Sequence, residues 1–197
     1  MNRGGFSRFI PLILFVGVIV VVIAALISIG GRLFGSETST NDPGETALVS
    51  MDVENSVRMT ARGAIVSQEE HRSYQIEISP EQRSLVAYEG YLERPLETVE
   101  LGNNSRAYEE FVYALSRSEL MRGNEGSEDE KDLRGRCPKG SVYVYETINA
   151  SGVVKRLWTS TCRGESGTLK ANHSSVRDLF LAQIPEGQDT IRPLRIR

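Results

Sequence analysis

The sequence predicts an α+β protein: an N-terminal transmembrane helix followed by one antiparallel sheet domain with two main helices packed on one face. Three observations support this class. An uncharged apolar run occupies residues 9–31, several later stretches of strand length alternate apolar and polar residues, and two longer segments place apolar residues at helical spacing. Strand runs that are broken by helices and joined by hairpin-length turns are typical of such a sheet.

The apolar run has no charged residue between Arg8 and Arg32. About 20 apolar residues in a helix match the hydrocarbon core of a membrane, so we expect residues 9–31 to span the lipid bilayer. Arg3 and Arg8 precede the run, whereas an acidic flank follows Arg32. Basic residues favour the cytoplasmic side. The sequence therefore predicts a single-pass membrane protein with residues 1–8 as a cytoplasmic tail, the N-terminus inside and the C-terminal domain outside.

This run has two other possible interpretations. A cleaved signal peptide has a possible site at Ser28-Ile29-Gly30, but its apolar region ordinarily covers about 7–15 residues and this run is longer. Gly5-Phe6 resembles a type IV prepilin junction, yet Ile10 stands where that family places Glu. We therefore expect a retained signal-anchor.

Residues 32–55 are predicted to be a stalk with a short helix. Asp42-Pro43-Gly44-Glu45 has a capping residue, a first-turn proline and a glutamate three residues after the cap, so the helix should begin there and reach about Met51. The extracytoplasmic α+β domain is then 56–186. Residues 187–197, which contain several arginines, are predicted to be a flexible basic tail.

The elements of the domain follow from local patterns. Strands are expected at 57–66, 74–79 and 85–90, with a short edge piece around Val99 and Leu101. A helix capped by Asn104 or Ser105 should reach about Leu120, and a last helix capped by Ser175 should end before Pro185. The acidic stretch 121–136 between them is predicted to be a solvated loop.

The clearest local signal is a hairpin of 141–149 and 152–161. If Ala150 and Ser151 form the centre of its turn, four side chains share one face. Aromatic residues and arginine dominate interface hot spots, so this set is the candidate partner-binding face: Tyr143, Tyr145, Arg156 and Trp158. Two alternatives are open. The face is covered by another element, or the strands pair one residue out of step, which sets Glu146 opposite Arg156.

Cys137 and Cys162 are the only cysteines in the sequence, and both follow the apolar run. An even count in an oxidising compartment predicts one disulfide. In the hairpin register above, the two residues have the same parity, and Pro138 and Gly140 can bend the chain enough to join them. The register that is one residue out of step would place the two sulfurs on opposite faces.

The sequence excludes several functions. Its net charge of −3 gives no basic surface for nucleic acid. His71 and His173 each stand alone, so we expect no metal site. No phosphate-binding loop or nucleophile-elbow motif occurs, so neither cofactors nor catalytic residues are predicted.

One enzyme alternative deserves a test. Thr159-Ser160-Thr161-Cys162 resembles the Thr-Leu-x-Thr-Cys segment of the sortases, membrane-anchored cysteine transpeptidases, although Ser160 stands in place of the Leu. The resemblance implies Cys162 as nucleophile, with His71 and either Arg163 or Arg177 as its helpers. A thiolate nucleophile also needs a free sulfur.

A second resemblance covers most of the outer domain. The segments Val57–Thr60, His71–Tyr74 and Leu157–Cys162 are similar to those of uncharacterised single-pass membrane-anchored envelope proteins of small-genome bacteria. This resemblance implies no activity. We therefore expect a non-catalytic, membrane-anchored extracytoplasmic domain that takes part in envelope assembly or binds a protein partner.

Overall fold

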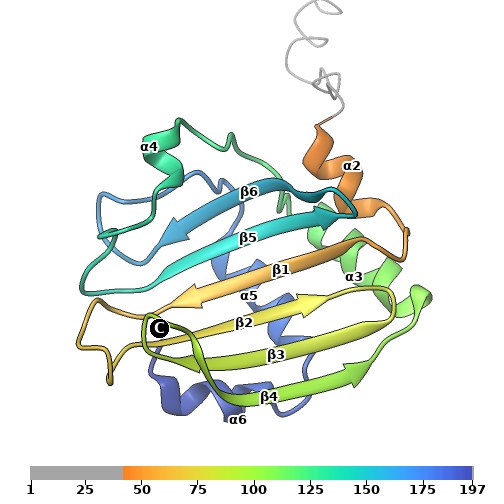
Figure 1. The fold of residues 1–197 in the computed structure, drawn as a ribbon. Coiled ribbons are helices and arrows are strands. Elements are labelled where there is room, and N and C mark those ends of the chain that lie inside the picture. Colours follow the sequence, from red (N-terminus) through yellow and green to blue (C-terminus); the bar gives the residue numbers. More distant parts are fainter. Residues whose placement is uncertain (1–41, 197) are drawn as a thin grey trace, which may run out of the picture. The chain divides into compact units, whose positions relative to one another are not determined.

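The computed structural model describes residues 42–196, which form an α+β domain built on one six-stranded antiparallel sheet (Figure 1). The strand order is β4-β3-β2-β1-β5-β6. The strands are β1 Ser56–Arg62, β2 Arg72–Ile78, β3 Gln82–Glu89, β4 Arg94–Gly102, β5 Val142–Asn149 and β6 Gly152–Ser160.

The sheet is made of a four-stranded meander and a hairpin. Strands β1 to β4 each pair with the next, and the chain then leaves the sheet through a helix. It returns as β5, which pairs with the free edge of β1 and sets Met59 opposite Tyr145. β1 is therefore paired on both sides, once with its neighbour in sequence and once with β5, whose residues follow their partners in β1 by 80 to 92 positions.

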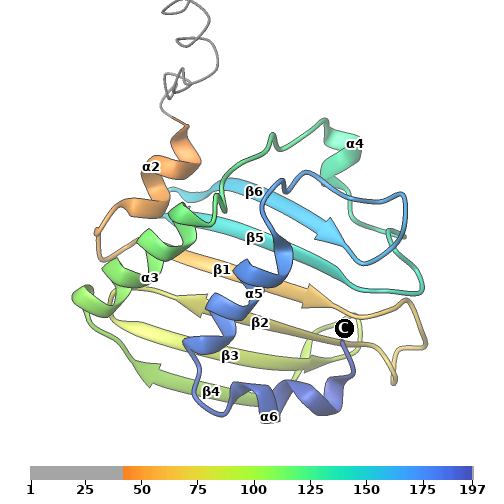
Figure 2. The same cartoon turned by 180° about the vertical axis from the view of Figure 1, so that it is seen from behind.

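The helices α3 (Ser105–Arg117), α5 (His173–Ala182) and α6 (Gly187–Ile191) lie on one face of the sheet (Figure 2). Each strand places alternate residues on that face, and these residues form the main core, because apolar side chains at period two are buried by the apolar stripe of each helix. Phe111 of α3 meets Phe180 of α5 edge to face, with ring centroids 5.3 Å apart. The buried strand residues include Val57, Met59, Tyr74, Ile76, Leu85, Tyr145 and Leu157.

The predicted α+β class with one antiparallel sheet is confirmed for the described residues, and the two longer helices, α3 and α5, lie on one face of that sheet (Figure 2). The ends of several elements differ from the prediction. Asn104 caps α3 as expected, and its side chain accepts a hydrogen bond from the backbone of Ala107. The last helix begins earlier than predicted because Asn172, not Ser175, is the cap. The side chain of Asn172 accepts a hydrogen bond from the backbone N–H of Ser175 at 3.0 Å, so Ser175 lies inside the first turn of the helix.

The short helix α2 (Pro43–Val49) has the predicted cap, since Asp42 Oδ1 accepts a hydrogen bond from the backbone of Gly44 at 2.8 Å. Its assignment to a stalk was wrong. Leu48 is fully buried in the main core, and the buried ammonium of Lys155 on β6 donates to Asp42 Oδ2 and to the carbonyl of Met121. The helix is thus a part of the folded domain.

The prediction of a flexible tail at 187–197 was also wrong for the part that the structure describes. α6 is followed by a 3-10 turn, η2 (Arg192–Leu194), and both Ile191 and Ile196 are buried in the main core. The arginines of this segment suggested exposure, but the two isoleucines, each next to an arginine in sequence, supply the apolar contacts that hold the segment in the core.

The segment between α3 and β5 contributes a second, smaller core on the opposite face of the sheet. It contains one short helix, α4 (Glu128–Lys131), rather than loop alone. Leu133 and Cys137 of this segment pack against Val142, Val144 and Trp158 of the hairpin.

The predicted cytoplasmic tail, the transmembrane helix at 9–31 and the first part of the stalk lie outside the described residues. From 42 to 196, none of the helices has the length and apolar character needed to cross a membrane.

Candidate functional site

The hairpin register differs from the predicted one because of a β-bulge. Near the turn, Ile148 lies opposite Val153 as predicted, but the register shifts between Thr147 and Ile148, where β6 has Val154 as an extra residue. Beyond the bulge, Tyr145 lies opposite Leu157, and Glu146 lies opposite Arg156. The alternative register is therefore the one found along most of the hairpin.

This shift separates the four residues of the predicted partner-binding face, so that prediction was wrong. Tyr143 and Tyr145 point to the helix-covered side, where they are 1% and 0% exposed. Trp158 and Arg156 lie on the other side of the sheet, and Trp158 is only 5% exposed within the smaller core. A one-residue shift exchanges the two faces of a strand, so the aromatic residues cannot form one surface.

The two tyrosines instead form a buried polar cluster with His173. The hydroxyl of Tyr145 lies 2.9 Å from His173 Nδ1, and the ring of His173 packs against Tyr143 with centroids 4.1 Å apart. Burial, with the nearby positive charge of Arg177, lowers the pKa of His173 below its usual value. Burial also raises the pKa of Tyr145 well above the ordinary value. All members are therefore neutral near pH 7, which suits a structural cluster beneath α5.

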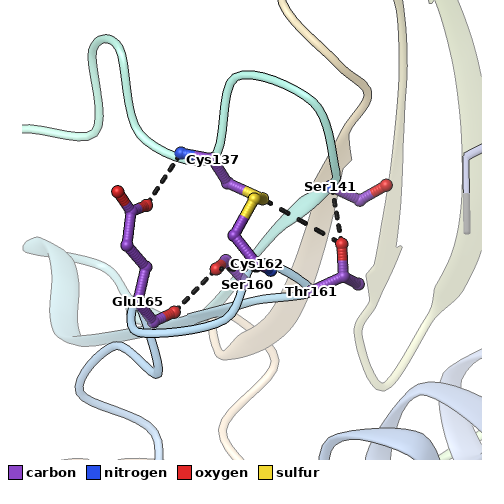
Figure 3. The surroundings of a disulfide bond; sticks show 6 residues. All are labelled: Cys137, Ser141, Ser160, Thr161, Cys162 and Glu165. Atoms are coloured by element: carbon purple, nitrogen blue, oxygen red, sulfur yellow. Dashed lines mark hydrogen bonds between the residues drawn. A yellow bond between two sulfur atoms is a disulfide. The ribbon is translucent and has the colours of Figure 1, made fainter.

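Cys137 and Cys162 form a disulfide, as predicted, with their Cα atoms 5.4 Å apart (Figure 3). Both residues lie beyond the paired strands, so the strand parity used to predict the bond does not govern it. The bond is held in a small polar network. Glu165 Oε2 accepts a hydrogen bond from the backbone of Cys137, and Thr161 Oγ1 accepts one from the backbone of Ser141.

The disulfide also removes the sulfur that the sortase-like alternative requires. Cys162 Sγ is bonded to Cys137, and neither cysteine is free. His71 bonds to the carbonyl of Ala64, while His173 is buried against Tyr145. Residues 42–196 also hold no group of three His, Cys, Asp or Glu side chains suited to a metal ion.

The face of the sheet opposite the three helices carries a row of alternating charges. Glu77, Arg58, Glu146 and Arg156 are successive cross-strand neighbours on β2, β1, β5 and β6. Arg58 contacts Glu77 at 2.9 Å and Glu146 at 3.5 Å. Arg156 lies 3.5 Å from the other oxygen of Glu146. Each charge faces an opposite charge, as favourable cross-strand pairs do, so the row stabilises strand pairing rather than marking a binding site.

The exposed apolar residues with the clearest grouping lie at one end of the sheet, which we call the tip. It comprises the loop from β1 to β2 and the turn from β3 to β4, at the end of the sheet opposite α2 (Figure 1). Four large apolar side chains gather there, and Leu92 is 87% exposed. They are Ile65, Val66, Tyr91 and Leu92. Apolar side chains that gather on a surface are a mark of interaction sites.

The tip is held in place by hydrogen bonds between its two loops. The hydroxyl of Tyr91 donates to the carbonyl of Val66 at 2.7 Å and accepts from the N–H of Val66 at 3.0 Å. The ring of Tyr91 stacks on His71, with centroids 4.1 Å apart and planes only 10° from parallel. Gly90 has a φ of 75°, and a Cβ there would lie 2.0 Å from the side chain of Gln68. Glycine is therefore required for the two loops to meet.

Beside these side chains is a hollow of about 320 Å3. Such a volume is at the lower end of the range for small-molecule sites. It is lined by the tip, by the end of β1 and by the segment that the disulfide secures. The residues that matter chemically are Arg62, Ile65, His71, Tyr91, Glu93, Arg134 and Arg136.

None of these tip residues was singled out as a binding residue from the sequence, where His71 entered only the sortase-like alternative. The hollow joins segments around residues 62, 91 and 135, and only the pairing of β1 with both β2 and β5 brings them together. No sequence motif signals such a junction. Compared with known proteins, the sequence matches no protein-family model and is not significantly similar to any curated protein.

Proposed function

We propose that this chain is a single-pass membrane protein whose outward domain binds a partner protein through the tip and catalyses no reaction. The observation that carries the proposal is the gathering of Ile65, Val66, Tyr91 and Leu92 on a surface that is already fixed by hydrogen bonds. A preorganised surface loses little conformational entropy on binding, so a small apolar patch can contribute useful affinity.

Two further facts support the location of the domain. The chain contains an uncharged apolar run at 9–31 with arginines before it. The domain contains a disulfide, and disulfides persist in oxidising compartments. Both facts agree with a domain on the outer side of a membrane, where envelope assembly takes place.

The test is site-specific photo-crosslinking in cells that express the full chain. A photoreactive amino acid replaces Leu92 in one variant and Tyr113 in the other. Tyr113 is the matched control, because it is a 48% exposed aromatic residue on α3, away from the tip. We expect a discrete adduct from position 92 and none from position 113. No adduct at position 92, or the same adducts from both positions, would contradict the proposal.

A further inference from the structure

The hollow beside the tip has walls of fixed geometry. The backbone of Gly90 donates to the carbonyl of His71, and the backbone of Ile65 donates to the carbonyl of Pro138 at 2.9 Å. The second bond connects the loop after β1 to the segment that holds Cys137. Three chain segments are thus tied together around the hollow by hydrogen bonds of the protein itself.

The charge of the lining is predominantly positive. Arg62, Arg134 and Arg136 line the hollow, and Glu93 is the one carboxylate among the lining residues. Arg134 is already paired with Asp132, at 2.5 Å. Arg62 and Arg136 have no carboxylate within ion-pair distance among the described residues. Arg136 lies over the ring of Trp158, 5.6 Å from its centroid, and its Nη2 donates a hydrogen bond to the carbonyl of Asp129 at 3.3 Å. The Nε and Nη1 groups of Arg136 make no hydrogen bond within the described residues, so they can donate to a ligand.

We propose that the hollow binds an anionic group, either a carboxylate or a phosphate, through the guanidinium groups of Arg62 and Arg136. Guanidinium groups match the geometry of both anions and form charge-assisted hydrogen bonds with them. Ile65 and the stacked rings of His71 and Tyr91 provide apolar surface for the part of the ligand next to its anionic group. This inference rests on the proposed function for its biological meaning, since it predicts that the partner of the tip carries an anionic group.

The test is an NMR titration of the full chain, labelled with 15N and held in a zwitterionic detergent. Sodium acetate is added in one titration and inorganic phosphate in another. We expect saturable shifts of the amide signals of Arg62, His71 and Tyr91. Arg62→Gln should weaken binding about tenfold, because a hydrogen bond to a charged group is lost. Glu93→Gln should strengthen it, since the repelling carboxylate is removed. Arg117→Gln is the control, because Arg117 lies at the end of α3 and outside the hollow, and it should leave binding unchanged.

The source of the anion is separated by two further titrations, with short-chain phosphatidylglycerol and short-chain phosphatidylcholine. Saturation by phosphatidylglycerol alone, at lower concentration than by phosphate, would assign the anion to a lipid headgroup, and the reverse order would assign it to a soluble group. No saturable shift with any anion, or equal binding by wild type and Arg62→Gln, would overturn the proposal. This titration uses no partner protein, so a negative result rejects the anion site only. A negative crosslinking result at position 92 rejects the proposed partner binding by the tip.

Discussion

Gly44 lies where α2 meets the buried side chain of Lys155. A Cβ at this position would be 2.3 Å from Lys155 Cδ, and Lys155 cannot easily move because its ammonium binds Asp42 and the carbonyl of Met121. Burial alone would raise the pKa of Asp42, but the hydrogen bonds from Lys155 and from the backbone of Gly44 outweigh it and lower that pKa. The absence of a side chain at residue 44 is thus required for α2 to pack.

Gly44→Ala should therefore lower the free energy of unfolding by about 1–3 kcal/mol, as overpacking does, even though alanine favours helix formation. Urea denaturation measures this loss. Gly102→Ala is the control, because a Cβ at Gly102 would meet nothing within 4 Å. Equal stability of Gly44→Ala and wild type would show that α2 is not tightly packed against β6.

His173 makes the stability of the domain depend on pH, and the lowered pKa of His173 sets the direction of that dependence. Its pKa in the folded state is lowered by burial and by Arg177, whereas in the unfolded chain it is about 6.5. Between these two values the unfolded state binds the proton and the folded state does not, so stability rises with pH in this window. The contribution of neutral His173 to stability is complete above about pH 6.5. It is lost as the pH falls from there through the pKa of His173 in the folded state.

The measurement is the free energy of unfolding of wild type and of His173→Gln at about pH 7 and about pH 5. Wild type should lose more stability on acidification than the variant, which lacks the titrating ring. Other groups, Asp42 among them, titrate equally in both proteins and cancel in the comparison. If both proteins lose the same stability, His173 is not held neutral by the fold.

At the scale of elements, the smaller core depends on Trp158. It packs with Leu133, Val142 and Val144, but the N–H of its indole ring is buried and has no hydrogen-bond partner among the described residues. Trp158→Ala should cost about 3–5 kcal/mol, as for large buried aromatics. Trp158→Phe should cost clearly less, because it keeps a ring and removes the unpartnered N–H. Thermal unfolding measures both variants, and a harmless Trp158→Ala would show that this core contributes little.

The disulfide joins the segment after α4 to the end of β6 across 25 residues of sequence. Cross-linking a loop of this size stabilises the fold by roughly 3–4 kcal/mol in the chain-entropy model. Replacing both cysteines by serine should therefore shift the urea midpoint downward. Reduced wild type should behave like this variant, and identical midpoints for oxidised and reduced protein would contradict the estimate.

The hairpin shows what the sequence can and cannot predict about elements. The alternation of apolar residues and the Asn149–Gly152 turn were sufficient to locate β5 and β6 within one residue. The register was not predictable from the turn, because Val154 adds a residue to β6 beyond it. The opposite charges of Glu146 and Arg156 favour the register that the structure has, but the predicted register offers more aliphatic and aromatic pairs, so side-chain pairing alone favours the wrong one.

At the scale of the whole molecule, local patterns predicted the α+β class and the antiparallel sheet, but not which side of the sheet the helices cover. They did not predict the strand order, because the β1–β5 pairing joins residues that are far apart in sequence and carry no motif. The tip and its hollow depend on that pairing, so the candidate site could be found only from the structure. Arg62 and Tyr91 are ordinary residues in isolation.

The proposed function requires the domain to lie outside the cytoplasm and residues 1–8 to lie inside. The direct measurement is labelling of single introduced cysteines by a membrane-impermeant maleimide in intact cells that express the full chain. Thr98→Cys, at an exposed position of β4, reports on the domain, and Ser7→Cys reports on the N-terminus. We predict that position 98 is labelled in intact cells and that position 7 is labelled only after lysis. Labelling of position 98 only after lysis would contradict this topology.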